Sequence, residues 1–292
     1  MAITGRIDLH MHSTVSDGTD LPSGILRCAK NAGLSLFALT DHDAVSGCGE
    51  IRALLSETEE KTPAFLPGVE FSCRDERGKY HILGYGYDTE KPGILEVVDK
   101  GHGLRMEKVR ARLDFLRERF GFSFSREDLQ ELLSYANPGK PHIANLMVRY
   151  GYAKTKEEGI RDYLNQLRLP GAYVRPEEAI RGILDSGGIP VLAHPSYGSG
   201  DQIIVGEEMR ERIRYLMDYG LLGLEAYYSG FTPKLQAEIL SCAEEYGLYV
   251  MAGSDYHGKN KLIAMGENNL ACAEEGHPAL GRFLERVSEL VS

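Results

Sequence analysis

The sequence predicts an α/β barrel that is interrupted by an all-helical insertion. Short apolar runs typical of strands alternate with helical patterns near both ends of the 292-residue chain, as expected for parallel β–α units. Residues 94–172 between them show helical periodicity instead. Imidazole and carboxylate side chains recur where the predicted strands end, which is typical of the open end of such a barrel.

The predicted elements follow the chain in two groups. Before the insertion, the predicted strands are 6–9, 33–40, 64–70 and 79–87, and the predicted helices are 22–31 and 47–58. After residue 180, the predicted strands are 189–194, 222–228 and 248–254, and the predicted helices are 207–219, 233–246 and 277–290. About seven such units would close a barrel.

The insertion is rich in Arg, Glu, Leu and Tyr. Prolines and glycines at 91–93 and 170–171 bound it, and Ser125 to Asp128 resembles a capping box before a leucine-rich helix. We therefore expect a barrel domain formed by residues 1–93 and 173–292, and a helical insertion domain formed by residues 94–172.

Composition limits the classes of function. The net charge of −10 argues against a basic face that grips long nucleic acid, although bound metal ions would still make one pocket attractive to a small anionic substrate. The sequence has no apolar stretch of the ~20 residues needed to span a membrane and no signal peptide. Five scattered cysteines without a C-x-x-C pair fit free thiols in a reducing cytoplasm, so we expect a cytoplasmic protein.

A metal site is the best explanation for the polar residues at the strand ends. Any one of them has an ordinary alternative: Asp17-Gly18 reads as a turn, and Asp41-His42-Asp43 could cap a helix. Turns and caps would not, however, place ligand types after most core strands, where an unpaired buried charge is costly. The candidate ligands are His10, His12, Asp17, His42, Glu70, His81, His194, Asp255 and His257.

The motifs that contain these residues resemble the polymerase-and-histidinol-phosphatase (PHP) family of metal-dependent phosphoesterases over nearly the whole chain. The resemblance rests on DLHMHSTVSDG (8–18), LTDHDAVSG (39–47), GVEFS (68–72), HILGY (81–85), VLAHP (191–195) and GSDYHG (253–258). It implies a distorted seven-stranded β/α barrel with a trinuclear metal centre and a phosphatase activity.

The same resemblance implies three ligand sets. His10, His12, Glu70 and Asp255 would hold the first ion; Glu70, His81 and His194 the second; and Asp17, His42 and His257 the third. Two or three divalent ions are expected, with manganese preferred and iron or zinc possible. Glu70, His194 and Asp255 are the candidate catalytic residues, because water shared between two ions would become a hydroxide nucleophile.

The position of the insertion is similar to the branch of the family that contains nucleotide 3′,5′-bisphosphate phosphatases and 5′-to-3′ exoribonucleases. That branch carries a Gly-Arg-x-His stretch, where this chain has Gly139-Lys140-Pro141-His142. Arg105, Lys140 and His142 are the candidate substrate-binding residues, with a solvated surface charge or a helix cap as the alternative. The expected substrate is a nucleotide or short oligonucleotide, most simply a nucleoside 3′,5′-bisphosphate.

Three other functions stay open: a 5′-to-3′ exoribonuclease on short oligonucleotides, a phosphatase of the histidinol phosphate type, and a non-catalytic metal-binding accessory module. Further residues are candidates to support the ligands. Asp8, Asp41 and Asp43 could accept the free N–H of ligating imidazoles, and Glu225 could orient a ligand or form an ion pair at the barrel rim.

Overall fold

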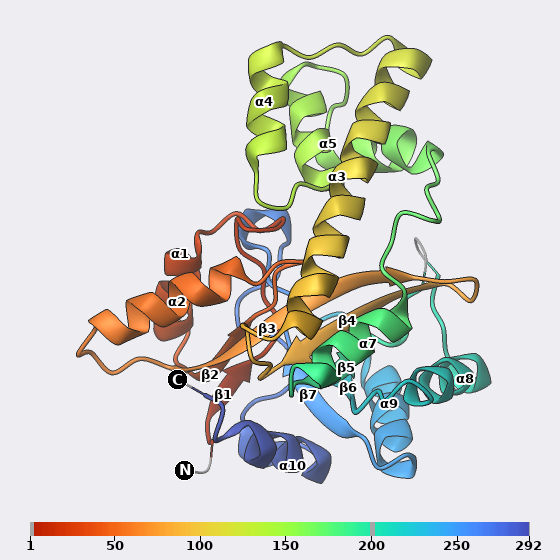
Figure 1. Cartoon of the computed structure of the whole chain (residues 1–292). Helices are drawn as coiled ribbons and strands as arrows, with labels where there is room; N and C mark the ends of the chain where they lie inside the picture. Colours follow the sequence, from red (N-terminus) through yellow and green to blue (C-terminus); the bar gives the residue numbers. More distant parts are fainter. Residues whose placement is uncertain (1–2, 199–201, 292) are drawn as a thin grey trace.

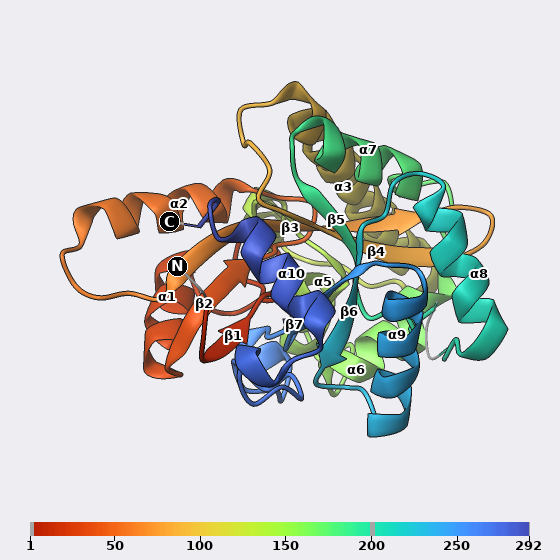
Figure 2. The same ribbon diagram turned by 90° about the horizontal axis from the view of Figure 1, so that it is seen from below.

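The computed structural model describes residues 3–198 and 202–291. Its strands are β1 (Arg6–Asp8), β2 (Leu34–Leu39), β3 (Ala64–Arg74), β4 (Lys79–Tyr85), β5 (Ile189–Leu192), β6 (Gly223–Tyr228) and β7 (Tyr249–Gly253). They form one sheet that runs from β1 to β7 in chain order. The sheet curls until β1 approaches β7, where the amide of Leu9 donates to the carbonyl of Ala252 at 2.9 Å. The predicted barrel, nearly closed, is confirmed (Figure 2).

One strand departs from the parallel β–α units that the alternation of strands and helices predicts. β4 runs antiparallel to both β3 and β5, whereas the other neighbouring pairs are parallel. The cause is the connection between β3 and β4, which is only residues 75–78 and cannot provide the dozen or more residues of a parallel crossover. β3 also extends to Arg74, four residues beyond its predicted end, so that Glu70 lies inside the strand rather than at its tip.

Helices cover the outside of this barrel. They are α1 (Pro22–Asn31), α2 (Ser46–Glu57), α7 (Pro176–Asp185), α8 (Gly206–Met217), α9 (Pro233–Glu245) and α10 (Pro278–Val287), with short 3-10 turns η3 (Gly258–Asn260) and η4 (Ala273–Glu275). Several begin with proline, whose fixed φ and missing N–H suit the first helical turn. α10 crosses the lower end of the barrel, where the ring of Phe283 lies 5.6 Å from that of Tyr85 (Figure 2).

The segment between β4 and α7 is helical, as predicted. It contains α3 (Pro92–Phe120), α4 (Arg126–Ser134), α5 (Lys140–Arg149), α6 (Lys156–Glu158), the π-helical turn η1 (Gly159–Tyr163) and the 3-10 turn η2 (Leu164–Gln166). α3 begins beside β3 and β4 and rises into an upper lobe formed with α4 and α5 (Figure 1). The predicted cap is confirmed, since Ser125 Oγ accepts a hydrogen bond from the amide of Asp128.

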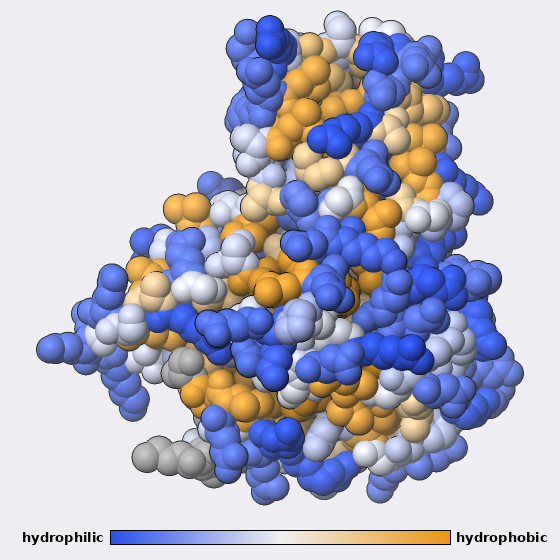
Figure 3. Space-filling model, viewed as in Figure 1, coloured by the Kyte–Doolittle hydropathy of each residue, from blue (hydrophilic) through white to orange (hydrophobic). Residues whose placement is uncertain are grey.

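The upper lobe has its own hydrophobic core, in which Val109 and Leu116 of α3 pack with Leu132, Ile143 and Met147. A separate core is what an independent unit needs, so we propose that the lobe is a domain; the boundaries at residues 94 and 172 stay a prediction. Figure 3 shows apolar side chains on one face of this lobe, bordered by hydrophilic ones. Within the described residues, no helix is both long and apolar enough to cross a membrane.

Candidate metal centre

The structure brings all nine predicted ligands together at one end of the barrel. His10 and His12 follow β1, His42 follows β2, and His194 follows β5. Asp255 and His257 follow β7, while Asp17 lies in the loop between β1 and α1. The positions of these residues after the ends of parallel strands agree with the prediction, because functional residues of such barrels gather where strands end. Glu70 and His81 arrive differently, from within the antiparallel pair of β3 and β4.

Glu70 lies at the centre of this cluster. Its carboxylate oxygens are 2.8–3.4 Å from nitrogens of five imidazoles, which belong to His10, His12, His42, His81 and His194. These five imidazoles come from β4 and from the segments that follow β1, β2 and β5. Such a contact between one carboxylate and five imidazoles is not expected in an ordinary apolar core.

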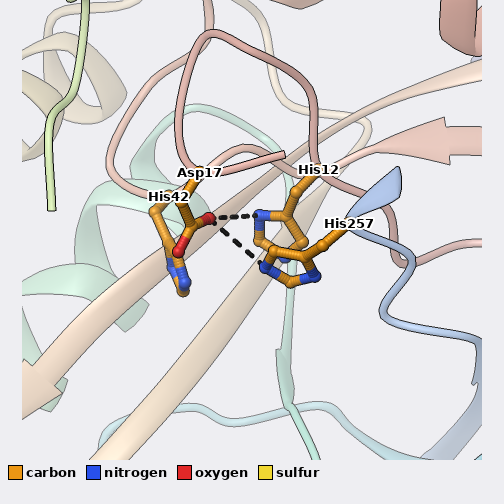
Figure 4. A group of neighbouring side chains, drawn as sticks. All are labelled: His12, Asp17, His42 and His257. Atoms are coloured by element: carbon orange, nitrogen blue, oxygen red, sulfur yellow. Dashed lines mark ion pairs between the residues drawn. The ribbon is translucent and has the colours of Figure 1, made fainter. Parts of the chain in front are cut away.

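Two further carboxylates complete the cluster. Asp255 Oδ1 lies 3.4 Å from His12 Nε2 and 3.3 Å from His257 Nδ1. Asp17 Oδ1 lies 3.3 Å from His257 Nε2 and 3.8 Å from His12 Nδ1, as the dashed lines in Figure 4 show. The cluster therefore contains three carboxylates among six imidazoles.

The ligand atoms fall into three overlapping groups. Within each group they lie no more than 4.8 Å apart: His12, Asp17, His42 and His257 (Figure 4); His10, His12 and Glu70; and His42, Glu70 and His81. These groups overlap the three expected ligand sets, but His12 and His42 each belong to two groups, and His194 and Asp255 belong to none. Which side chain binds which ion stays a prediction.

The donor atoms fit divalent cations. Six buried atoms of the cluster have no hydrogen-bond partner: Nε2 of His10, His12 and His81, Nδ1 of His194, Oδ1 of Asp17 and Oε1 of Glu70. Leaving a buried polar atom unpaired costs about 1–3 kcal/mol, so a cation that these atoms coordinate would remove that cost. Imidazole and carboxylate ligands suit manganese, iron or zinc.

Burial and mutual contact shift the pKa of these groups in opposite directions. Burial would raise the pKa of Glu70, but the imidazoles of His81, His42 and His10 hold it well below its usual range. Burial lowers the pKa of His81 to about 4 against the attraction of Glu70. Glu70 and His81 are thus poised as ligands, with anionic oxygen and neutral nitrogen. Against the effect of burial, Asp255 and Glu70 raise the pKa of His12 to about 9, so a cation that His12 binds would have to displace its proton.

Glu225 supports two of the ligands and is fully buried. Its Oε1 lies 2.9 Å from His10 Nδ1, and its Oε2 accepts a hydrogen bond of 2.7 Å from the amide of His194. These contacts are the ones expected of a residue that orients two ligands, one of the two alternatives for Glu225. Because the ligation of His10 and His194 stays a prediction, this role does too.

The expected role of three aspartates is wrong, because Asp8 and Asp41 bind backbone amides and hydroxyl groups, and Asp43 binds a guanidinium and an amide, rather than imidazoles. Asp8 accepts from the amide and the hydroxyl of Ser254 at 2.9 and 2.6 Å. Asp41 accepts from the amide and the hydroxyl of Ser13 at 2.8 and 2.6 Å. Asp8 and Asp41 thereby hold together the segments that carry the candidate ligands. Asp43 instead forms an ion pair with Arg105.

Arg105 is one of the predicted substrate residues. Its Nε and Nη2 donate to Asp43 Oδ2 at 3.1 and 2.6 Å, and Nη2 also donates to Ser72 Oγ at 3.1 Å. Lys140 donates to Asn165 Oδ1 at 2.5 Å. His142 caps α5 by accepting from the amide of Gly139 at 3.0 Å, the alternative that the sequence left open.

An inner cavity of about 150 Å³ adjoins the cluster. It is lined by Asp17, His42, Ser72, Lys79, His81, Arg105, Lys108, Arg112, Gly139, Lys140, Pro141 and Tyr173. The sequence reasoning missed Lys79, Lys108 and Arg112. A signal was available for the last two, since Arg105, Lys108 and Arg112 share one face of α3 at i, i+3 and i+7. His142 lines another pocket, in the upper lobe.

A side cavity of about 370 Å³ opens from the same cluster. It includes Asp17, His42, Glu70, His81, His194, Asp255 and His257, together with Lys156, Asn260 and Lys261. Lys261 forms an ion pair with Asp255. Lys156 of α6 donates to the carbonyl of Asn260 at 2.9 Å, which fixes the upper lobe to the loop after His257.

No family model matches the chain, but curated relatives do. It is 30% identical over 264 residues to a 3′,5′-nucleoside bisphosphate phosphatase of Chromobacterium violaceum, which covers 86% of this chain and 87% of that protein. Identity is 28% over 271 residues to a 5′-3′ exoribonuclease of Haemophilus influenzae, with 91% and 95% covered. It is also 28% over 264 residues to a phosphoribosyl 1,2-cyclic phosphate 1,2-diphosphodiesterase of Eggerthella lenta, with 86% and 94% covered.

Two solved structures are similar in fold. One from Chromobacterium violaceum, described as an amidohydrolase with bound sulfate and no metal, has a TM-score of 0.81 and 25% identity, with 98% of this chain and 97% of that chain covered. The other, assigned as a metal-dependent phosphoesterase of Bifidobacterium adolescentis, has a TM-score of 0.76 and 26% identity, with 90% and 91% covered.

Proposed function

Because the chain belongs to the PHP family and is a metal-dependent phosphoric ester hydrolase, we propose that it removes the 3′-phosphate of a nucleoside 3′,5′-bisphosphate. In this reaction water adds to phosphorus, the ester P–O bond breaks, and inorganic phosphate and a nucleoside 5′-monophosphate leave. The observation that carries the proposal is the inner cavity, which places unneutralised cations beside the metal-binding cluster.

The charge of the inner cavity favours a substrate with a second phosphate. Arg105 is neutralised by Asp43, but among the described residues Lys79, Lys108 and Arg112 form no ion pair with a carboxylate. Lys108 and Arg112 are only 6% and 5% exposed, and their partner is the neutral side chain of Tyr173 rather than a counter-ion. Burying a charge without a counter-ion is costly. A phosphate group in the cavity would supply the missing counter-charge.

We assign the metal ligands as the family resemblance implies. His10, His12, Glu70 and Asp255 would hold one ion; Glu70, His81 and His194 a second; and Asp17, His42 and His257 a third. Two or three divalent ions, manganese for preference, would supply Lewis-acid activation of water and neutralise the charge of the reacting phosphate. Glu70, His194 and Asp255 are then the proposed catalytic residues.

The chain's own residues position the substrate around that point. The 3′-phosphate lies at the cluster, and Lys108, Arg112 and Lys140 bind the second phosphate in the inner cavity. Each charge-assisted hydrogen bond to phosphate contributes about 1.5–3 kcal/mol. Arg105, fixed by Asp43, positions the wall of the cavity and presents Nη1 toward Gly139.

A release assay for inorganic phosphate tests the proposal. Purified protein with manganese is given a nucleoside 3′,5′-bisphosphate, a 5′-phosphorylated trinucleotide, phosphoribosyl 1,2-cyclic phosphate and histidinol phosphate, and the products are identified by chromatography. We expect the highest kcat/KM for the bisphosphate, with the 5′-monophosphate as product. A higher kcat/KM for any other substrate would refute the proposal.

The matched variants are His194→Ala and His102→Ala. His194 contacts Glu70 in the cluster, whereas His102 is exposed on α3. We expect His194→Ala to abolish turnover with an unchanged circular dichroism spectrum, and His102→Ala to behave as the wild type. Normal turnover by a metal-stripped, folded His194→Ala protein would exclude the assigned centre.

A second candidate function, trimming of short RNA from its 5′ end, is favoured by the side cavity. It offers Lys156 and Lys261, neither of which lines the inner cavity. If the 5′-phosphate of an oligonucleotide occupied the inner cavity, the nucleotides after the first could extend out through the side cavity. Release of 5′-mononucleotides from the trinucleotide, faster than phosphate from the bisphosphate, would identify this function.

A further inference from the structure

An outer cavity of about 480 Å³ lies next to the inner one. It is lined by Arg74, Lys79, Arg112, Lys140, Asn165, Leu167, Arg168, Leu169, Tyr173 and Gly198. Lys79, Arg112, Lys140 and Tyr173 also line the inner cavity, but none of the nine cluster residues lines the outer one. The order is therefore cluster, inner cavity, outer cavity.

The chain that encloses the outer cavity comes from both parts of the molecule. Arg74 and Lys79 flank the turn between β3 and β4, whereas Arg168 lies in the segment that descends from the upper lobe to α7 (Figure 1). Arg112 reaches it from α3. A space bounded by the barrel and by the lobe is suited to a ligand that extends outward from the cluster.

The lining is strongly cationic for a protein whose net charge is −10. Among the residues that the structure describes, five of those lining the cavity are lysine or arginine and none is aspartate or glutamate. Such a local excess of one sign attracts ligands of the opposite sign. Because Lys79, Arg112 and Lys140 face both cavities, their charge serves an anion in either one.

An unpaired buried atom also points to a ligand. Arg112 is 5% exposed and donates a side-chain hydrogen bond to Tyr173, but its Nε has no hydrogen-bond partner. A guanidinium presents its donors in a planar fork that matches the oxygens of a phosphate group. Arg112 stands at the junction of the two cavities, where a bridging phosphoanhydride would lie.

We propose that the outer cavity binds a further phosphoryl group attached to the phosphate in the inner cavity. The enzyme would thus prefer nucleoside 3′-phosphate 5′-diphosphates to 3′,5′-bisphosphates, and would remove the 3′-phosphate from both. This inference rests on the proposed function, because it places the 3′-phosphate at the cluster. An oligonucleotide would leave by the side cavity, which shares no lining residue with the outer one.

The experiment measures KM for both substrates, with chromatographic identification of the products. Arg168→Met removes a charge that lines the outer cavity alone, and Lys108→Met removes one that lines the inner cavity alone. Arg161→Met is the control, since Arg161 is an exposed arginine of the same lobe that pairs with Asp162.

For the wild type we expect a KM about tenfold lower for the 5′-diphosphate, the effect of one charge-assisted hydrogen bond. Arg168→Met should remove most of this preference, Lys108→Met should raise both KM values, and Arg161→Met should change neither their ratio nor their size. As a measurement without a variant, a nucleoside 5′-diphosphate should inhibit the wild type about tenfold more strongly than the 5′-monophosphate.

The outcomes separate the two hypotheses. Equal KM values for both substrates in the wild type, or an unchanged preference in Arg168→Met, would overturn the outer site. Phosphate release from the bisphosphate in the same experiment would still support the proposed function. Cleavage of the phosphoanhydride within the 5′-diphosphate would also overturn the outer site, because the 5′-diphosphate rather than the 3′-phosphate would then lie at the cluster. No phosphate release from either substrate would refute the proposed function itself.

Discussion

Replacing Arg105 by alanine tests the buried ion pair between α3 and the loop after β2. Asp43 is 2% exposed and Arg105 is 8% exposed. Without the guanidinium, Asp43 keeps the amide of Ser72, 3.0 Å from its Oδ1, but Oδ2 loses hydrogen bonds of 3.1 and 2.6 Å. Breaking a buried pair from one side costs about 3–5 kcal/mol, because the remaining charge is left uncompensated.

The same figure predicts a shift in the melting temperature. Unfolding entropy of about 2.1 cal/mol/K per residue gives about 0.6 kcal/mol/K for 292 residues, so Arg105→Ala should melt about 5–8 °C lower. Urea unfolding followed by circular dichroism measures the free energy directly. Runs with manganese and with EDTA should give the same loss, since it arises from the ion pair and not from metal release.

A double variant provides the control. Asp43 has a φ of 49°, a left-handed conformation that asparagine tolerates well, so Asp43→Asn removes the charge without straining the backbone. The free energy of unfolding lost in the double variant Arg105→Met/Asp43→Asn should be about 2–3 kcal/mol smaller than the sum of the losses in Arg105→Met and Asp43→Asn measured singly. Additive losses, or a loss below about 1 kcal/mol for Arg105→Ala, would show that the pair is not the stabilising element assumed here.

Three further predictions concern the metal centre and the inner cavity. Glu225→Gln replaces one of two acceptors by a donor and should lower metal affinity about 10- to 100-fold; chelator titration with elemental analysis measures it, and unchanged affinity would exclude the orienting role. Dialysis against EDTA should abolish turnover and lower the unfolding free energy by about 2.7 kcal/mol relative to protein with metal at 100 times its Kd; full activity in metal-free protein would contradict a metal-dependent reaction. Burial and the neighbouring Arg105 lower the pKa of Lys108 to about 7, whereas bound phosphate favours the charged ammonium; KM for the bisphosphate should therefore rise as the pH increases above 7. Lys108→Arg should abolish this rise, because a guanidinium stays protonated, and an identical pH profile in that variant would contradict the assignment.

Local sequence was sufficient to select the nine candidate ligands that the fold brings together. His10 and His12 are spaced two apart at the end of an apolar run, and Asp255 and His257 repeat the pattern after the last strand. The end of a strand and the alternation of its side chains can be inferred from residues close in sequence. These positions could therefore be placed at strand ends without knowing which side chains from other strands lie opposite them. The helical character of the insertion followed from its periodicity in the same way.

Contacts between distant segments could not be assigned in this manner. Glu225 supports His10 across 215 residues of sequence, and nothing in its own strand distinguishes it from a residue at the rim. Arg105 resembled a free phosphate-binding group until the fold placed Asp43 against it. The cations of the inner and outer cavities likewise come from β3, β4, α3, α5 and the segment before α7.

The sequence by itself determined the α/β alternation, the helical insertion and which nine side chains could bind metal, because each depends on short-range periodicity and on residue chemistry. Only the tertiary structure decided that β4 runs antiparallel and that Glu70 contacts five imidazoles. It also placed lysines and arginines, most of them without a carboxylate partner among the described residues, around an inner cavity beside the cluster and an outer cavity next to that one. The physical reason is that strand order and barrel closure set the distances between remote side chains. Those distances, rather than the residue types, determine which charges are neutralised and which remain available to a ligand.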